Sequence, residues 1–169
     1  MSSNGRHQGA IVIATDPMLQ WFLLQQKCAR HPDIACRGKN SFVGGEVEAG
    51  ETSRQAIIRE AGEEFPGSAG VALSQKLRPL WDLAVTHPGG EYDLSVFERR
   101  LMEADLRWIT TQPCTEGMPV VVPRAELLDQ QFIYGLKGVA ALYLRERGLP
   151  ARDELTCSVG ISRTYEGAI

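Results

Sequence analysis

The stretch GEVEAGETSRQAIIREAGEEFPG, residues 45–67, decides how this chain folds and where its chemistry lies. Glu60, Glu63 and Glu64 place three carboxylates in the last turns of a short predicted helix. A helix C-terminus carries partial negative charge, which disfavours each carboxylate there by about 0.3–1 kcal/mol. Mutual repulsion adds about 3 kcal/mol per pair at a separation of ~6 Å and an effective dielectric constant of ~20. Helix propensity does not offset these costs, so the cluster indicates a site for a divalent cation.

The boundaries of this helix follow from its local sequence. Thr52 and Gln55 fit a capping box, so the helix is predicted to begin at Ser53. Pro66 cannot continue a helix and Gly67 accepts a left-handed turn, so the two residues end it. One apolar stripe for packing on a sheet is predicted at Ile57, Ile58, Ala61 and Phe65. The three glutamates are predicted to project from a different face.

A run of glutamates on a helix is more often a solvated surface than a site. Here the helix dipole opposes the cluster, no lysine follows within the next turn, and Arg59 is the only cation nearby in the sequence. Arg59 also has another candidate partner, since a bidentate ion pair with Glu51 would hold it across the preceding loop. Before the helix, Gly44 and Gly45 supply a backbone that can approach a bound group closely. These details favour a metal site over a solvated face.

The same residues resemble the signature of the Nudix hydrolases. That signature runs glycine, five residues, glutamate, seven residues, Arg-Glu, an aliphatic residue, any residue, Glu-Glu, any residue, glycine and an aliphatic residue. The matching positions are Gly45, Glu51, Arg59, Glu60, Ala61, Glu63 and Glu64. Pro66 stands in place of the last glycine and Gly67 in place of the last aliphatic residue, both after the carboxylates. The signature spans many fixed positions, so it is far more specific than a lone glycine pattern.

The resemblance implies a metal site that binds Mg²⁺, with Mn²⁺ as an alternative. It implies Glu60 and Glu64 as the main ligands, Glu63 as a ligand directly or through water, and the carbonyl of Gly44 as a further ligand. Gly45, Glu51 and Arg59 are the supporting residues that it implies. The charge pattern by itself also favours the carboxylates as ligands, because Mg²⁺ prefers oxygen donors. The carbonyl ligand rests on the resemblance alone.

The rest of the chain reads as short strands and one further helix. One hairpin is expected at residues 10–14 and 21–26, and a second at residues 80–86 and 92–99. Two more strands are expected at residues 42–43 and 119–122, and a helix at residues 131–147. Strands between two helices predict an α/β fold, and the resemblance implies the Nudix-type α/β/α sandwich with a mixed β-sheet. One domain is expected over residues 1–150, followed by a polar, loosely docked tail over residues 151–169.

The implied reaction is hydrolysis of the diphosphate linkage in a nucleoside diphosphate derivative, which is a nucleoside triphosphate, a sugar nucleotide or a dinucleotide. Water attacks phosphorus, and a metal removes the charge repulsion that protects the linkage. A general base must reach that water. The candidates are Glu60, Glu91, Glu103 and Glu116. Glu116 is preferred because Gly117 and a predicted strand follow it, although an acidic residue is individually more often an ordinary surface residue.

Residues that select the substrate are less evident in the sequence. A basic segment that precedes the glycines holds Lys27, Arg30, His31, Arg37 and Lys39. From this segment Arg37 and Lys39 are predicted to contact phosphates, although a solvated loop is the commoner role for such residues. The aromatic side chains available to stack on a base are Trp21, Trp81, Tyr92 and Trp108, while His87 sits in a turn.

Two other functions remain open on the sequence. One is a Nudix-fold sensor that binds a nucleotide without cleaving it, which the presence of every catalytic glutamate disfavours. The other is a prenyl diphosphate isomerase, which would need a reactive cysteine and a second metal site. The cysteines are too irregularly spaced for a zinc site or a disulfide framework, at Cys28, Cys36, Cys114 and Cys157.

Composition limits the partners and the compartment. The net charge of −3 over 169 residues argues against a nucleic-acid surface. No run approaches the ~20 apolar residues of a membrane span, and residues 1–8 lack the apolar core of a signal peptide. We therefore expect a cytoplasmic protein with a small-molecule substrate, no nucleic-acid or membrane partner, and possible homodimers.

Overall fold

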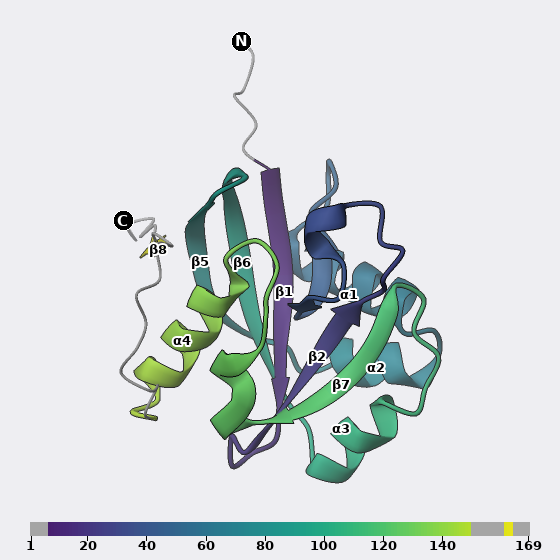
Figure 1. The fold of residues 1–169 in the computed structure, drawn as a ribbon. Coiled ribbons are helices and arrows are strands. Elements are labelled where there is room, and N and C mark those ends of the chain that lie inside the picture. The colour runs from purple at the N-terminus through teal and green to yellow at the C-terminus, as the bar shows by residue number, and fades with distance from the viewer. Residues whose placement is uncertain (1–6, 150–160, 164–169) are drawn as a thin grey trace, which may run out of the picture.

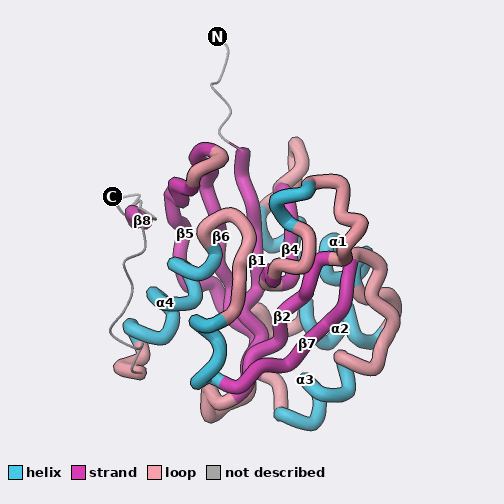
Figure 2. Tube along the Cα trace, in the orientation of Figure 1, coloured by secondary structure: helices cyan, strands magenta, loops and turns pink. Residues whose placement is uncertain are grey.

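The computed structural model of the chain describes residues 7–149 and 161–163. Figure 1 shows the elements in space and Figure 2 shows how helices, strands and loops alternate. The strands are β1 (His7–Thr15), β2 (Trp21–Lys27), β3 (Asn40–Ser41), β4 (Val43–Glu46), β5 (Arg78–His87), β6 (Gly90–Arg100), β7 (Gly117–Pro123) and β8 (Ile161–Arg163). The α-helices are α1 (Ser53–Glu64), α2 (Ser68–Ser74), α3 (Glu103–Ile109) and α4 (Leu136–Glu146), and the 3-10 helices are η1 (Ile34–Cys36) and η2 (Arg124–Asp129).

The sheet is mixed because β1 pairs in both directions. It runs parallel to β6, from His7 beside Tyr92 to Thr15 beside Arg100. It runs antiparallel to β2 and to β4. β2 also pairs antiparallel with β3 and with β7. β5 pairs antiparallel with β6 and with β8. The predicted hairpins of β1 with β2 and of β5 with β6 are therefore confirmed.

Two apolar cores lie on the two faces of this sheet. Successive side chains of a strand point to opposite faces, so Ile11 and Ile13 of β1 join one core while Val12 joins the other. The first core packs against α4, and the second packs against α1, α2 and α3. In Figure 1, α4 accordingly lies apart from the other three helices. Each fully buried Leu, Ile or Phe contributes about 1.5–3 kcal/mol. The predicted α/β/α sandwich is confirmed.

Local sequence sets the bounds of α1 as predicted. Thr52 is the N-cap, and its side chain and that of Gln55 form the reciprocal capping box. The helix ends at Glu64, and the chain then turns through Gly67 at a φ of 80° into α2. The predicted stripe is correct except at Ile58, which is 49% exposed. Each residue turns a helix by about 100°, so Ile58 falls at the edge of the stripe while Ala56 is buried.

Other helices differ from the prediction. The second helix begins at Leu136 and not at residue 131, because Tyr134 and Gly135 have φ angles of 47° and 79°, which are incompatible with a right-handed helix. Phe132 instead forms an isolated bridge with Asn40. The short helices α2 and α3 were not predicted, since seven residues each carry too little periodicity to stand out.

Part of the expected C-terminal tail joins the sheet. β8 pairs antiparallel with β5, with Ile161 opposite Val85. The remainder of that tail, residues 151–160 and 164–169, lies outside the described residues. Within the described ranges, none of the helices combines the length and the apolar character needed to cross a membrane.

Candidate active site

Two glycines of β4 bring the backbone against the carboxylates of α1. The Gly44 N–H donates to Glu64 Oε2 at 3.3 Å. A Cβ on Gly44 would lie 2.1 Å from the Ala10 carbonyl oxygen, and its φ of 136° suits glycine. A Cβ on Gly45 would lie 2.5 Å from Glu60 Oε1. Both positions therefore need glycine, the first for the sheet and the second for the carboxylate.

Arg59 connects the loop before α1 to the glutamates at its end. Its Nη2 lies 2.7 Å from Glu51 Oε1, which is the ion pair expected from the sequence. Its Nη1 lies 2.8 Å from Glu60 Oε1 and 3.3 Å from Glu63 Oε2. The hydrogen bond from Arg59, together with the backbone of Glu48, holds the pKa of Glu51 below its usual range. Arg59 thus fixes the loop and offsets part of the charge on the cluster.

The three glutamates of α1 have different environments. Glu64 is only 1% exposed, because it follows Ile57 by seven residues and so lies on the same buried face. The prediction that all three project away from the apolar stripe is therefore wrong for Glu64. Burial raises the pKa of Glu64 to about 7, against the opposing effect of Lys27. Burial also raises the pKa of Glu60, while Arg59 lowers it.

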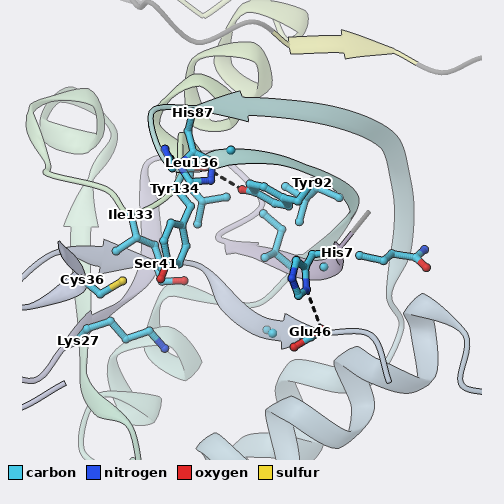
Figure 3. Close-up of a pocket in the computed structure, with 18 of the residues that line it drawn as sticks. His7, Lys27, Cys36, Ser41, Glu46, His87, Tyr92, Ile133, Tyr134 and Leu136 are labelled. Carbon is cyan, nitrogen blue, oxygen red and sulfur yellow. Dashed lines mark hydrogen bonds and ion pairs between the residues drawn. The ribbon is translucent and has the colours of Figure 1, made fainter. Parts of the chain in front are cut away.

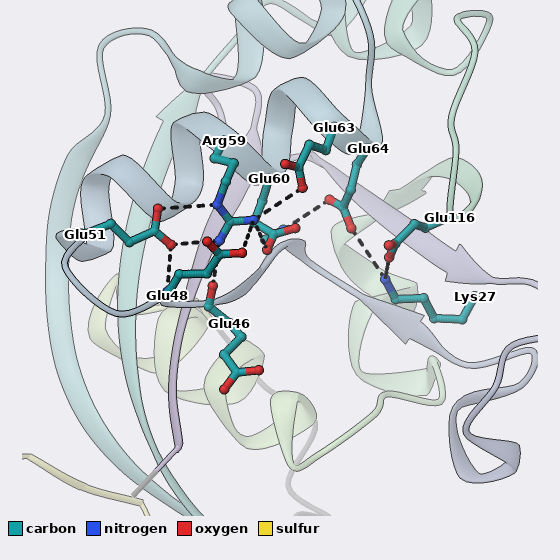
Figure 4. A network of polar contacts seen from close by, with 10 residues as sticks. Lys27, Glu46, Glu48, Glu51, Arg59, Glu60, Glu63, Glu64 and Glu116 are labelled. Carbon is teal, nitrogen blue, oxygen red and sulfur yellow. Dashed lines mark hydrogen bonds and ion pairs between the residues drawn. The ribbon is translucent and has the colours of Figure 1, made fainter. Parts of the chain in front are cut away.

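Lys27 is the cation that neighbours Glu64. The sequence placed it in a basic loop, but it is the last residue of β2 and is only 6% exposed. Its Nζ lies 2.6 Å from Gln25 Oε1, 3.3 Å from Glu116 Oε2 and 3.4 Å from Glu64 Oε1. Figure 4 shows its ammonium joined by contacts to both carboxylates. Lys27 therefore brings Glu116 and Glu64 to one place.

The loop that carries Glu116 is fastened to the end of α1. The Thr115 N–H donates to the Glu64 carbonyl at 2.9 Å, and the Thr115 hydroxyl donates to the Glu63 carbonyl at 2.8 Å. These bonds satisfy carbonyls that have no partner within the helix. On the other side, Gly117 pairs with Lys27 at the start of β7. The loop that carries Glu116 is thus held between α1 and the sheet.

The donors at this site fit a hard divalent cation in their chemistry. Glu60 and Glu64 offer carboxylate oxygens beside the Gly44 backbone, and oxygen donors are what Mg²⁺ and Mn²⁺ prefer. Across residues 7–149 and 161–163, no three His, Cys, Asp or Glu side chains converge as a preformed metal site. In the structure, Arg59 pairs with Glu60 and Lys27 pairs with Glu64. Metal binding at this site would therefore require these ion pairs to rearrange.

A cavity of about 620 Å³ adjoins the cluster. Lys27, Glu60 and Glu116 line it, together with both glycines of β4. Aromatic rings of the β5–β6 hairpin and of the segment before α4 line it too, and Figure 3 shows His87 and Tyr92 at the opposite end of the view from Lys27. The cavity volume falls within the range of small-molecule sites.

The aromatic end of the cavity has three rings. His87 lies 5.7 Å from Tyr92 and 5.3 Å from Tyr134, measured between ring centroids. The Tyr92 hydroxyl donates to the Tyr134 carbonyl at 2.8 Å, and the Tyr134 hydroxyl donates to Asp33 Oδ2 at 2.5 Å. The left-handed backbone of Tyr134 is costly for a non-glycine residue, and such backbone strain is concentrated at functional sites.

The structure separates the predicted site residues into two groups. Tyr92, Glu91 and Glu116 line the cavity, as does His87, which the sequence identified only as a turn residue. The predicted site residues that do not line it are Glu51, Arg59, Glu63, Glu64, Glu103, Trp21, Trp81, Trp108, Arg37 and Lys39. Arg37 donates to the His31 carbonyl and Glu103 pairs with Arg107. The phosphate role of Arg37 and Lys39 remains a prediction.

Tyr134 is one of the lining residues that sequence reasoning missed. It fell inside the predicted helix of residues 131–147, although Gly135 directly after it was a signal for a turn. Lys27 was noticed only as one of several basic residues. Nothing in the local sequence indicated that its ammonium is buried beside Glu64.

A comparison with family models identifies the family of the chain. The model of the NUDIX domain matches residues 5–110, which is more than half of the chain. The chain belongs to the NUDIX domain family. The predictions of a Nudix protein and, at the level of the family, of a pyrophosphohydrolase are confirmed. No curated protein sequence matches the chain significantly.

Solved structures of Nudix proteins share the fold at low sequence identity. The MutT protein from Methanosarcina mazei is 14% identical, with 86% of this chain and 99% of that chain covered and a TM-score of 0.61. The dihydroneopterin triphosphate pyrophosphohydrolase of E. coli is 18% identical, with 82% and 95% covered and a TM-score of 0.61. The NUDIX domain of Shewanella oneidensis NrtR, complexed with ADP ribose, is 15% identical, with 87% and 90% covered and a TM-score of 0.59. At these identities the likeness shows the fold.

Proposed function

We propose that this Nudix protein is a metal-dependent hydrolase that cleaves the diphosphate linkage of a nucleoside diphosphate derivative. One observation carries the proposal: a single cavity is lined by the carboxylates Glu60 and Glu116 and by an aromatic group at His87, Tyr92 and Tyr134. The carboxylates, with a bound metal, suit an anionic linkage. The aromatic rings accommodate a planar base. Both sets are within reach of one bound molecule.

The chemistry divides among the residues of the cluster. Mg²⁺ or Mn²⁺, when bound, supplies charge stabilisation at the phosphate oxygens and a more acidic water. Glu60, Glu64 and the Gly44 carbonyl would hold it, with Glu63 contributing directly or through water. Glu116 is the preferred base, since it lines the cavity beside Glu64 and can take the proton of the attacking water at a carboxylate oxygen.

Turnover of a panel of compounds tests this function. Nucleoside triphosphates, sugar nucleotides and dinucleotides are incubated with the protein and Mg²⁺, and release of the phosphorylated product is followed. We expect at least one class to be hydrolysed, and we expect Glu64→Gln to lose most of the activity, since Glu64 is a proposed metal ligand. Absence of turnover for every compound would contradict the proposal, as would a Glu64→Gln variant with wild-type activity.

A sensor that binds a nucleotide without cleaving it is the second candidate. The structural likeness to a NUDIX domain in complex with ADP ribose supports it, as do the ion pairs that Lys27 makes with Glu64 and Glu116. Tight binding of an intact nucleotide with no product release would favour the sensor. The isomerase is not proposed, because burial raises the pKa of Cys36 and so disfavours a reactive thiolate at the cysteine that lines the cavity.

The remaining expectations concern the protein's surroundings. We propose a cytoplasmic location, a small-molecule ligand, and no nucleic-acid or membrane partner, as the composition indicates. Light scattering of the purified protein would decide between a monomer and a homodimer. One domain over residues 1–150 also remains a proposal.

A further inference from the structure

Lys27 occupies the position from which a single charge can act on both the metal ligands and the substrate. Its backbone is held on two sides, since its N–H donates to the Lys39 carbonyl and its carbonyl accepts from the Gly38 N–H. Its side chain is almost fully buried, yet it lines the cavity. A buried ammonium requires partners, and here they are Gln25, Glu64 and Glu116.

Two cations therefore neutralise the carboxylates from opposite sides. Arg59 contacts Glu60 and Glu63, while Lys27 contacts Glu64 and Glu116. The arginine is also bound to Glu51 and to the Glu46 carbonyl, so its guanidinium is fixed. The lysine has a flexible four-carbon stem, so its charge can move while its backbone stays in place. Lys27 is thus the cation of the cluster that is able to exchange partners.

A divalent cation and the Lys27 ammonium cannot share the Glu64 carboxylate at low cost. Like charges repel in inverse proportion to their separation, and the repulsion is strong where water is excluded. Lys27 then keeps Gln25 and Glu116 as partners and can accept a further anion, and the cavity that it lines is the place proposed for the diphosphate. This step rests on the proposed function.

We propose that Lys27 is an internal counter-ion of the carboxylate cluster that competes with the metal and, once displaced from Glu64, binds the diphosphate of the substrate. The lysine opposes metal binding in the absence of substrate and favours substrate binding once the metal is present. Metal and substrate then assist one another beyond their direct contact, since coupling between two ligands is reciprocal.

Two binding measurements on Lys27→Met test this proposal without any turnover. The first is the affinity for Mn²⁺ alone at pH 8. The second is the affinity for methylenediphosphonate, a non-hydrolysable probe, in saturating Mg²⁺. Relative to wild type, we expect Mn²⁺ to bind about 10-fold more tightly and the diphosphonate to bind about 10-fold more weakly, since one positive charge has been removed from beside both.

The opposite signs separate this role from a structural one. If Lys27 only supported the fold, its loss would weaken both ligands. Lys137→Met, a lysine of α4 that does not line the cavity, controls for the change in net charge. Lys27→Gln keeps a side chain that can hydrogen-bond to Gln25. It decides the result if thermal unfolding shows that Lys27→Met is not folded.

Each outcome has a defined meaning. Opposite shifts in both Lys27 variants, absent in Lys137→Met, support the proposal. An unchanged or weakened Mn²⁺ affinity overturns it, and so does an unchanged diphosphonate affinity. Failure of the wild type to bind Mn²⁺ at all would overturn the proposed hydrolase together with this role, whereas wild-type binding without the opposite shifts overturns the role of Lys27 alone.

Discussion

At Gly45 the backbone of β4 lies directly against a proposed metal ligand, Glu60. The space that a side chain would occupy there is filled by the carboxylate of Glu60. Gly62 on α1 offers a contrast, since a Cβ at that position has nothing within 4 Å. Two glycines of the same signature region thus have different reasons to be present. The first is required by the site, while the second only weakens the helix.

We expect Gly45→Ala to lower turnover by about 10–100-fold, because a misplaced catalytic group of this kind costs about that much. Its melting temperature should change little, since the new methyl group meets the end of a flexible side chain. Gly62→Ala is the matched control, and it should retain activity and gain about 0.5–1 kcal/mol of stability. Steady-state kinetics and thermal unfolding measure both. Wild-type activity in Gly45→Ala would show that Glu60 does not need its present position.

At the scale of elements, one buried carboxylate ties α4 to the sheet. Glu98 of β6 is 2% exposed and accepts from the Tyr143 hydroxyl at 2.5 Å, from Arg147 at 2.8 Å and from Arg100 at 3.0 Å. Arg147 also stacks on Tyr143, with its guanidinium carbon 3.5 Å from the ring centroid. Tyr143 and Arg147 come from α4 and the segment that ends it. The contacts lie away from the glutamates of α1, so they concern stability and not the proposed reaction.

Glu98→Gln is expected to destabilise the protein by about 3 kcal/mol, since it leaves the half-buried guanidinium groups of Arg100 and Arg147 without their carboxylate. Chemical denaturation measures the change. Glu103→Gln is the control, because its ion pair with Arg107 is exposed and of the i, i+4 kind. That variant should lose less than about 0.5 kcal/mol. Equal losses in the two variants would contradict the structural role of Glu98.

The same carboxylate predicts how stability depends on pH. Burial raises the pKa of Glu98, but the hydrogen bonds from Arg100 and Tyr143 outweigh it and hold the pKa below the ordinary value of 4.5. A carboxyl group with a lowered pKa in the folded protein contributes stability that is complete above its unfolded pKa. That contribution is lost as the pH falls through the folded value. Melting temperatures below pH 4.5 should therefore drop more steeply for wild type than for Glu98→Gln, and parallel curves would refute this assignment.

At the scale of the whole molecule, the site joins segments that are far apart in the chain. Lys27 of β2, Glu64 of α1 and Glu116 before β7 meet because β7 pairs with β2 and because Thr115 binds the end of α1. Tyr134 reaches the cavity from the segment before α4. The sheet thus places the proposed base beside the proposed metal ligands.

Replacing the proposed base should separate turnover from metal binding. We expect Glu116→Gln to lower turnover by about 100-fold or more, because the attacking water loses its proton acceptor. The affinity for Mn²⁺ should stay nearly unchanged, since Glu116 is not among the proposed ligands. Glu91→Gln is the comparison, as Glu91 also lines the cavity. Full activity in Glu116→Gln together with a large loss in Glu91→Gln would transfer the role to Glu91.

The sequence by itself determined the parts of the protein that depend on neighbours in the chain. The capping box of Thr52 and Gln55, the breaks at Pro66 and Gly67, and the turn after His87 are local, so α1 and the β5–β6 hairpin could be predicted. The spacing of Glu60, Glu63 and Glu64 identified the family for the same reason. The helical period also predicts that Glu64, seven residues after Ile57, lies on the buried face of α1, although a charged residue is usually exposed.

Only the tertiary structure decided what surrounds the carboxylates. No lysine follows Glu64 within the next turn of the sequence, yet Lys27, which precedes it by 37 residues, supplies a cation. The left-handed backbone of Tyr134 and the position of Glu116 depend likewise on contacts between distant segments. Such contacts follow from strand pairing and core packing, which local propensity does not encode. The local sequence therefore identified the chemistry of the carboxylates, whereas the packing of the sheet chose their counter-ion, the candidate base and the walls of the cavity.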